Sequence, residues 1–176
     1  MANSKSDAIA LLKSDHRKVE DLFEKFSKAR GNDRKTALVK EICTELMVHT
    51  MIEEEIFYPA LRGEIEDSAL DEAHVEHDGA KVLIAELLDS TPEASFYDAK
   101  VTVLKEEIEH HVKEEEKPSE GMFAQARDTD VDLKALGEQM AARKKELQKQ
   151  FAADGLPTPT TRSFKGARVE VGQPVA

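Results

Sequence analysis

The feature that most constrains this chain is an apolar stripe of helical period that recurs in four successive segments, each of which includes a histidine. Residues three or four positions apart share one face of an α-helix, and an apolar face is normally buried against other helices. The segments and their histidines are, approximately, 6–30 with His16, 33–60 with His49, 68–90 with His77 and 92–117 with His111. The pattern predicts four amphipathic helices that carry four imidazoles into the interior.

Two of these histidines are followed one helical turn later by a glutamate. In His49-Thr-Met-Ile-Glu53 and His111-Val-Lys-Glu-Glu115, the imidazole and the carboxylate lie on the same helix face. Burying a carboxylate without a partner is costly, and a metal ion held by imidazoles and carboxylates compensates for that cost. We therefore expect a dinuclear metal site with the ligands His16, His49, Glu53, His77, His111 and Glu115.

The neighbours on each helix face select between adjacent histidines. His77 shares its face with alanine and isoleucine side chains, whereas His74 shares its face with an aspartate and a lysine. Likewise, His111 follows a stripe of valine, leucine and isoleucine, whereas His110 follows two glutamates. Apolar neighbours favour His77 and His111 as the inward residues, and Glu115 belongs to the same face as His111.

The heights of the ligands along a bundle leave one alternative open. His16 and His49 are level across the turn that joins their helices. His77 lies about 12 residues before the next turn and His111 about 19 residues after it, which at about 1.5 Å per residue is a mismatch near 10 Å. An irregular start of the fourth helix would absorb this mismatch. Otherwise His74, which fits the height better, is the rival ligand.

The composition favours one soluble helical domain. The 176 residues are 35% charged, 40% hydrophobic and 5% aromatic, a profile more typical of helices than of a sheet sandwich. The net charge of −11 argues against binding to nucleic acid phosphates. The N-terminus lacks the apolar run of a signal peptide, and no stretch approaches the roughly 20 apolar residues of a membrane span. We expect a cytoplasmic protein that binds neither nucleic acid nor membranes, with Cys43 filling the core.

The order of these segments predicts an all-α fold. Short links between the helices favour an antiparallel up-and-down four-helix bundle, which we assign to residues 1–127. A further helical pattern predicts an extra C-terminal helix within residues 128–152. Residues 153–176 contain prolines and no apolar period, so a flexible tail is expected there.

The combined motifs resemble those of the bacterial hemerythrin-like, or hemerythrin HHE cation-binding, family over roughly residues 7–125. The motifs are Asp15-His16, His49-x-x-x-Glu53 running into Glu55-Ile-Phe-Tyr-Pro59, Glu76-His77 and His111-x-x-x-Glu115. The resemblance implies a four-helix bundle that holds two iron ions in a non-haem centre with an oxo or hydroxo bridge. Histidines 16, 49, 77 and 111 would be terminal ligands, Glu53 and Glu115 would bridge the metals, and no catalytic residue separate from the ligands is implied.

Two departures from the oxygen-carrying members of that family affect the expected chemistry. Those carriers have a second histidine one turn before the third-helix ligand, where this chain has Ala73. They also use His-x-x-x-x-Asp in the fourth helix, where this chain has His111-x-x-x-Glu115. On a pair of octahedral metals about two positions then stay open, or about one if His74 is a further ligand. The departures count against reversible oxygen carriage.

The side chains around the ligands and the identity of the metal are also constrained. Imidazole and carboxylate donors suit iron, manganese or zinc, and the resemblance favours iron among them. Asp15, Glu54, Tyr58 and Glu76 are candidates to orient the histidines, although a tyrosine at the position of Tyr58 is more often a simple residue of the bundle end.

Two function hypotheses of different classes follow. The first is a di-iron protein that reacts with hydrogen peroxide, dioxygen or nitric oxide in oxidative or nitrosative stress defence, with a peroxide- or nitric-oxide-consuming oxidoreductase as its enzymatic form. The alternative is an oxygen, iron or redox sensing or iron-handling module that acts through a partner, with the C-terminal helix and tail as its means of contact. The sequence leaves open the electron donor and the choice between monomer and homodimer.

Overall fold

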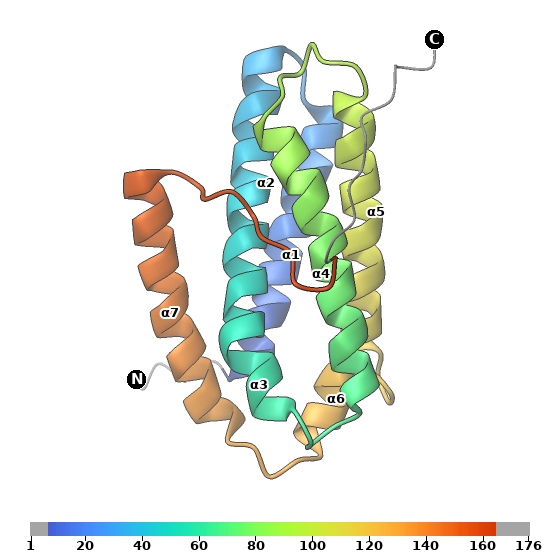
Figure 1. The fold of residues 1–176 in the computed structure, drawn as a ribbon, viewed down its shortest axis with the longest axis vertical. Coiled ribbons are helices and arrows are strands. Elements are labelled where there is room, and N and C mark those ends of the chain that lie inside the picture. Colours follow the sequence, from blue (N-terminus) through green and yellow to red (C-terminus); the bar gives the residue numbers. More distant parts are fainter. Residues whose placement is uncertain (1–6, 165–176) are drawn as a thin grey trace.

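The computed structural model describes residues 7–164, and all regular elements in that range are helices (Figure 1). They are α1 (Ala8–Lys28), α2 (Asn32–Ile52), the π-helix η1 (Glu53–Phe57), α3 (Tyr58–Leu61), α4 (Asp67–Leu88), α5 (Tyr97–Glu116), α6 (Met122–Arg127) and α7 (Leu133–Asp154). Helices α1, α2, α4 and α5 run alternately up and down, and η1 and α3 continue α2. The predicted all-α bundle with an extra C-terminal helix is confirmed. None of the helices described is long and apolar enough to cross a membrane.

Helix α1 illustrates how the sequence determines a helix and its buried face. The side chain of Asp7 accepts a hydrogen bond from the backbone N–H of Ala10 at 2.7 Å, which caps the N-terminus. Lys25 and Lys28 lie in the last turn, where positive charge is favourable. The buried apolar side chains of this helix include Ile9, Leu12, Val19, Phe23 and Phe26. Because His16 is on the same stripe, its imidazole faces the interior of the bundle.

Helix α5 begins later than the sequence predicts. The proline at position 92 was expected to open the helix, but α5 starts at Tyr97 after a turn in which Phe96 adopts the left-handed conformation, with φ of 67°. The late start brings His111 level with His77, and their Nε2 atoms lie 3.2 Å apart. An irregular helix start therefore absorbs the predicted height mismatch.

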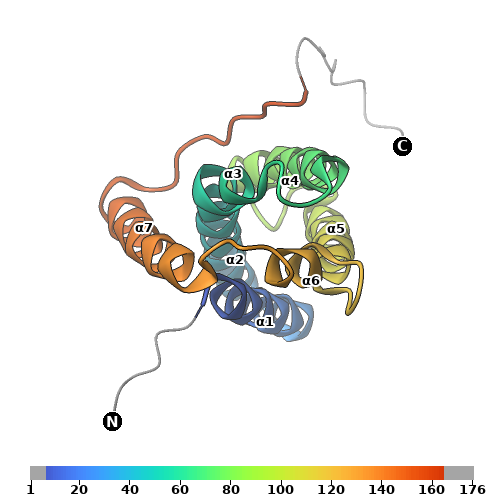
Figure 2. The same cartoon turned by 90° about the horizontal axis from the view of Figure 1, so that it is seen from below.

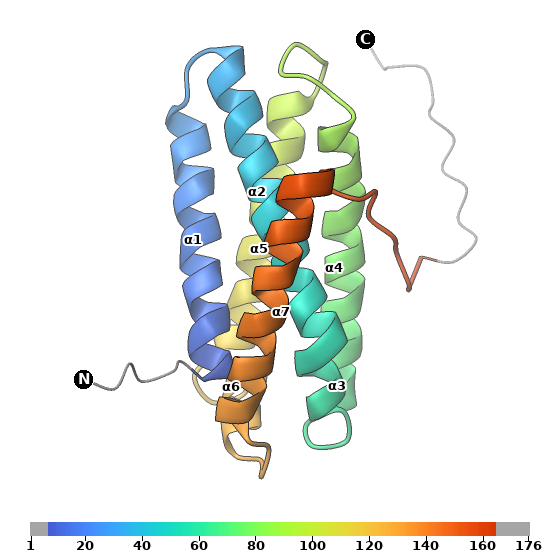
Figure 3. The same ribbon diagram turned by 90° about the vertical axis from the view of Figure 1, so that its left-hand side faces the viewer.

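Helices α6 and α7 extend the core beyond the four long helices. The short helix α6 lies at one end of the bundle and packs against α5 (Figure 2). Helix α7 runs along the outside of α1 and α2 (Figure 3). Its buried side chains belong to the same hydrophobic cluster as the bundle core, and they include Leu136, Met140, Leu147 and Phe151. The C-terminal helix is thus packed onto the bundle as part of one core.

Only part of the predicted flexible tail falls within the described residues. Positions 153 and 154 belong to the end of α7, and residues 155–164 form no helix or strand. This segment passes along α4, where the backbone N–H groups of Arg162 and Ser163 donate to Asp78 Oδ2 at 2.7 and 2.6 Å (Figure 1). Positions 165–176 lie outside the described residues.

The burial of α7 predicts a large effect of a single truncation. Met140 is fully buried, so Met140→Ala is expected to lower the free energy of unfolding by roughly 2–5 kcal/mol through the cavity that it leaves. Denaturant unfolding of the metal-free protein measures this change. Lys145→Ala, on the exposed face of α7, is the control and should leave stability unchanged. A loss below about 1 kcal/mol for Met140→Ala would show that α7 does not belong to the folded core.

Candidate metal centre

Four buried imidazoles meet in two facing pairs inside the bundle. His16 on α1 and His49 on α2 face each other with 3.2 Å between their Nε2 atoms. His77 on α4 and His111 on α5 face each other in the same way, also at 3.2 Å. Each of the four residues is at most 5% exposed, and 3.2 Å between the nitrogens leaves no room for a water molecule. The structure therefore brings one histidine from each long helix of the bundle into one cluster.

Two buried glutamates lie between the histidine pairs. Glu53 Oε2 is 3.1 Å from His49 Nε2 and 3.3 Å from His77 Nε2, and thus contacts one histidine of each pair. Glu115 Oε2 lies 3.3 Å and 3.6 Å from the Nε2 atoms of the other two histidines. Each carboxylate is placed between ligand atoms of both pairs, which is the position a bridging carboxylate requires.

Every histidine of the cluster turns its other ring nitrogen toward a carboxylate. The Nδ1 contacts are His16 to Glu116 at 2.7 Å, His49 to Asp15 at 3.7 Å, His77 to Glu54 at 3.1 Å and His111 to Glu76 at 2.7 Å. Where a carboxylate accepts the proton on Nδ1, a ring in its neutral form keeps its lone pair on Nε2, where a metal ion can bind. The facing Nε2 atoms of each pair can therefore hold a cation between them, either a proton or a metal ion.

Unsatisfied buried atoms provide an independent test of whether metal ions fit. Four buried side-chain atoms among the described residues have no hydrogen-bond partner, and all lie in or beside this cluster: Asp15 Oδ2, His49 Nδ1, Glu53 Oε1 and Glu115 Oε2. Leaving a buried carboxylate oxygen unpaired is unfavourable. Two groups have ligand atoms within 4.8 Å of one another, namely His16, His49, Glu53 and Glu115, and Glu53, His77 and His111. The donors fit metal ions, and Glu53 belongs to both groups.

The charges in the cluster are strongly coupled. Burial acts to lower the pKa of His49 and His77, but the facing carboxylates outweigh burial and raise the pKa to about 10 for His49 and about 9 for His77. For Glu53, burial acts to raise the pKa, whereas His49 and His77 hold it well below its usual range. Protonated imidazoles therefore balance the carboxylates when no metal is bound, and metal ions must displace these protons.

A π-helix brings a tyrosine into the cluster. The backbone N–H of Tyr58 donates to the carbonyl of Glu53, five residues earlier, which is the hydrogen bond of a π-helix. The wider turn places Tyr58 on the same side of the helix as Glu53. Tyr58 Oη lies 3.4 Å from Glu53 Oε2, 3.2 Å from Glu115 Oε1 and 3.3 Å from His77 Nε2. Tyr58 is thus a buried member of the cluster and not a simple residue of the bundle end.

The environment of Tyr58 favours its protonated form. Burial raises the pKa of Tyr58 well above its usual value, and the charges of Glu53 and Glu115 raise it further. The hydroxyl can therefore donate to a carboxylate at the centre of a cluster that consists mainly of acceptors.

The neighbouring histidines lie outside the cluster. The ring of His74 is half-buried and packs edge-on against Tyr58, with 5.3 Å between ring centroids. His110 is 61% exposed and lies 3.4 Å from Glu76. Neither histidine belongs to the groups of possible metal ligands in the described residues.

Glu116 orients His16 in the cluster, a role that the sequence analysis did not predict. It accepts from His16 Nδ1 and also from Arg17, at 2.7 Å in each case. Its position directly after Glu115, at the end of an acidic run, is typical of a solvated helix end. No specific signal in the sequence pointed to this contact, because Glu116 lies 100 positions from His16 and both residues had nearer charged neighbours.

Asp78 and Lys81 on α4 are buried, although the sequence reasoning used their polar character to favour His77 over His74. Asp78 is 1% exposed and Lys81 is 5% exposed. Lys81 Nζ donates to Glu54 Oε1 at 2.6 Å and to Asp78 Oδ1 at 3.2 Å, and the C-terminal segment covers Asp78. Glu54 therefore joins His77 to a buried ion-pair network on the outer side of the cluster.

Comparisons with known proteins agree with this site. The profile described as the hemerythrin HHE cation binding domain matches residues 7–126. The uncharacterized proteins Rv2633c of Mycobacterium tuberculosis and Mb2666c of Mycobacterium bovis are each 29% identical over 143 residues, which cover 81% of this chain and 88% of the relative. A DNA nickase of Nostoc is 26% identical over 106 residues, 60% of this chain and 30% of the nickase.

A solved structure shows the same architecture. The crystal structure of a hemerythrin HHE cation binding domain-containing protein from Mycobacterium kansasii, a homologue of Rv2633c, aligns with a TM-score of 0.70 and 28% sequence identity. The alignment covers 85% of this chain and 94% of that protein. Because the family profile spans most of the chain and the buried histidines and glutamates fall within it, this protein belongs to the hemerythrin HHE cation-binding domain family.

Proposed function

We propose that this protein is a non-haem di-iron protein that reacts with small oxidants, namely hydrogen peroxide, dioxygen or nitric oxide, in oxidative or nitrosative stress defence. The observation that carries the proposal is the pair of buried ligand groups that share Glu53. Ala73 stands one turn before His77, so that position supplies no further imidazole. A donor set of this size leaves coordination positions for a small molecule.

The residues that would hold the two irons divide by pair. His16 and His49 would hold one iron and His77 and His111 the other, with the carboxylates of Glu53 and Glu115 available to both pairs. Nitrogen and oxygen donors without thiolate suit iron in both its common oxidation states. When bound, the two irons supply one-electron redox steps and open positions for a small ligand.

The chain's own residues orient the donors and exclude water. The carboxylates at the Nδ1 atoms orient the rings of His16, His77 and His111. Phe123 of α6 stacks on His16 with 5.8 Å between ring centroids, and the fully buried Phe57 lies edge-on to Phe123. Tyr58 Oη supplies a proton donor within the cluster. These contacts favour reactants as small as peroxide or a diatomic gas.

Hydrogen peroxide is the first reactant to test. Two molecules of peroxide give two of water and one of dioxygen, so the reaction balances without an external electron donor. In this proposal the ligands hold and tune the metals, and no separate acid or base among the side chains is required.

A matched pair of glutamates tests the proposal. Glu53→Gln is expected to lower iron content and to reduce peroxide consumption per chain at least about tenfold, because Glu53 belongs to both ligand groups. Glu55→Gln is the control, since Glu55 points away to Arg143 at 2.7 Å and should retain both iron and activity. Metal analysis and oxygen evolution measure the two effects. An iron-loaded wild-type protein that consumes neither peroxide nor nitric oxide would contradict the proposal.

A second candidate function, sensing through a partner, is favoured by two contacts of the C-terminal segment. The C-terminal segment binds Asp78 through Ser163, and Arg162 Nε lies 3.9 Å from Glu54 Oε2, the carboxylate that faces His77. His77 is therefore connected through Glu54 to the segment at Arg162, whose side chain is exposed to a partner.

Limited proteolysis tests this second candidate. If the segment responds to the metal centre, adding iron to the metal-free protein should change the rate of trypsin cleavage after Arg162 at least about threefold. The reason is that a stronger or weaker contact between Arg162 and Glu54 changes how often the segment detaches locally from α4. Cleavage after Arg30, in the exposed turn between α1 and α2, is the internal control and should be unaffected. Equal changes at both sites, or none at Arg162, would contradict a sensing role for the segment.

A further inference from the structure

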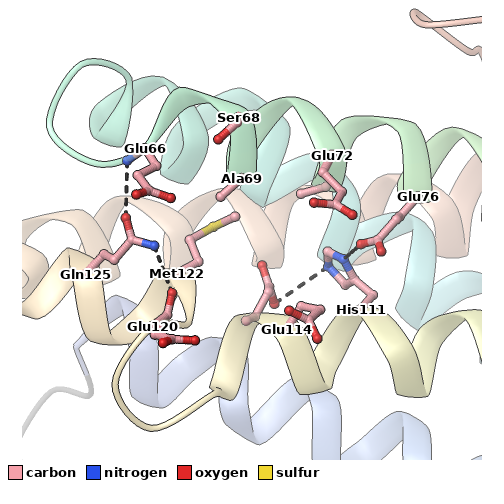
Figure 4. A pocket seen from close by; sticks show the side chains of 12 residues that line it. Glu66, Ser68, Ala69, Glu72, Glu76, His111, Glu114, Glu120, Met122 and Gln125 are labelled. Atoms are coloured by element: carbon pink, nitrogen blue, oxygen red, sulfur yellow. Dashed lines mark hydrogen bonds and ion pairs between the residues drawn. The ribbon is translucent and has the colours of Figure 1, made fainter.

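A cavity of about 200 Å³ lies between α4, α5 and the region of α6, and it reaches the metal centre (Figure 4). Six of its lining residues are glutamates, and none is a lysine or arginine. His111 and Glu115 line it and are 3% and 2% exposed, whereas Glu72 and Glu114 on its wall are exposed. The cavity thus runs from the surface to two members of the ligand cluster.

The buried end of the cavity carries an unsatisfied donor. Glu115 Oε2 has no hydrogen-bond partner and belongs to the ligand group formed with His16, His49 and Glu53. An acidic surface alone would not indicate a ligand, but here it leads to a buried carboxylate oxygen that requires a cation. Ala69 and Ala73 lie on the wall formed by α4, and their short side chains leave the passage open.

We propose that this acidic cavity is the route by which divalent metal ions reach the centre. Carboxylates of one sign around a narrow opening concentrate cations and repel anions. The inference rests on the metal centre and not on its reaction with oxidants, so it goes beyond the proposed function.

The glutamates are arranged in order of increasing burial. Glu72 and Glu114 are exposed, Glu76 is half-buried with one oxygen on His111 Nδ1, and Glu115 is buried. A hydrated divalent ion gives up its water reluctantly, so carboxylates that replace the water stepwise ease its transfer. Glu120, at the outer end of the cavity, forms an ion pair with Lys117 at 3.0 Å. Its negative charge therefore attracts a cation less strongly than the charges of the other glutamates.

The loop before α6 holds the outer wall in place. The side chain of Gln125 accepts from the backbone N–H of Glu66 at 3.2 Å and donates to the carbonyl of Glu120 at 2.8 Å (Figure 4). These two bonds link the start of α4 to the connection between α5 and α6. The opening is therefore bounded by backbone segments that Gln125 holds together.

Uptake of Co²⁺ by the metal-free, full-length protein tests the route. The double variant Glu72→Gln/Glu114→Gln keeps every ligand and should slow the appearance of Co²⁺ absorption at least about threefold at low ionic strength, with the difference shrinking in high salt. The final Co²⁺ content should match that of the wild type. Glu24→Gln/Glu41→Gln removes the same charge from exposed positions that do not line the cavity, and it should load at the wild-type rate.

A variant that narrows the cavity distinguishes passage through the cavity from attraction of metal ions by the charged surface. Ala69→Leu places a larger apolar side chain on the cavity wall at a half-exposed position and should slow uptake at low and high salt alike. Wild-type uptake rates in both the double variant and Ala69→Leu would overturn the route, and so would equal slowing by the control pair. A protein that takes up no Co²⁺ would overturn the route and the metal centre together. Normal uptake through this cavity without oxidant consumption would refute only the proposed function.

Discussion

The rest of the structure depends on imidazole nitrogens that face one another in a dry interior. The facing rings bring their Nε2 atoms to within 3.2 Å of each other, and the glutamates between them leave oxygens without hydrogen-bond partners. Such an arrangement is unfavourable unless cations occupy it. The four long helices, the ion pairs behind each ring and the aromatic cover from α6 all serve to hold these donors in place. Stability and metal binding are therefore linked in this fold.

Much of this arrangement is predictable from the sequence, because the buried face of each helix requires apolar residues at helical spacing. The apolar stripes predict the long helices, and the position of each histidine on its stripe predicts which imidazoles turn inward. The distinction between His77 and His74 came from the same pattern, although Asp78 and Lys81 proved to be buried. Periodicity reports the average environment of a face, and it cannot reveal an ion-pair network that a distant segment covers.

The features that the sequence did not predict depend on local backbone geometry or long-range contacts. The π-helix shifts Tyr58 into the cluster by widening a single turn, and no residue type marks that turn. The late start of α5 depends on the left-handed conformation of Phe96, a residue type that rarely adopts it. Glu116 reaches His16 across 100 positions of sequence, so its role follows from how two helices pack and not from either helix alone.

The packing of α7 onto α1 and α2 affects where the boundary of this domain should be drawn. It lies beyond residue 126, where the family match ends, yet Lys144 donates to Asp15 beside His49, and Arg143 binds Glu55. A fragment limited to the matched region would keep every ligand while baring the apolar surfaces of α1 and α2 that α7 covers. The segment that supplies the ligands is thus shorter than the segment that supplies the hydrophobic core, and a boundary drawn from the ligands alone would cut through that core.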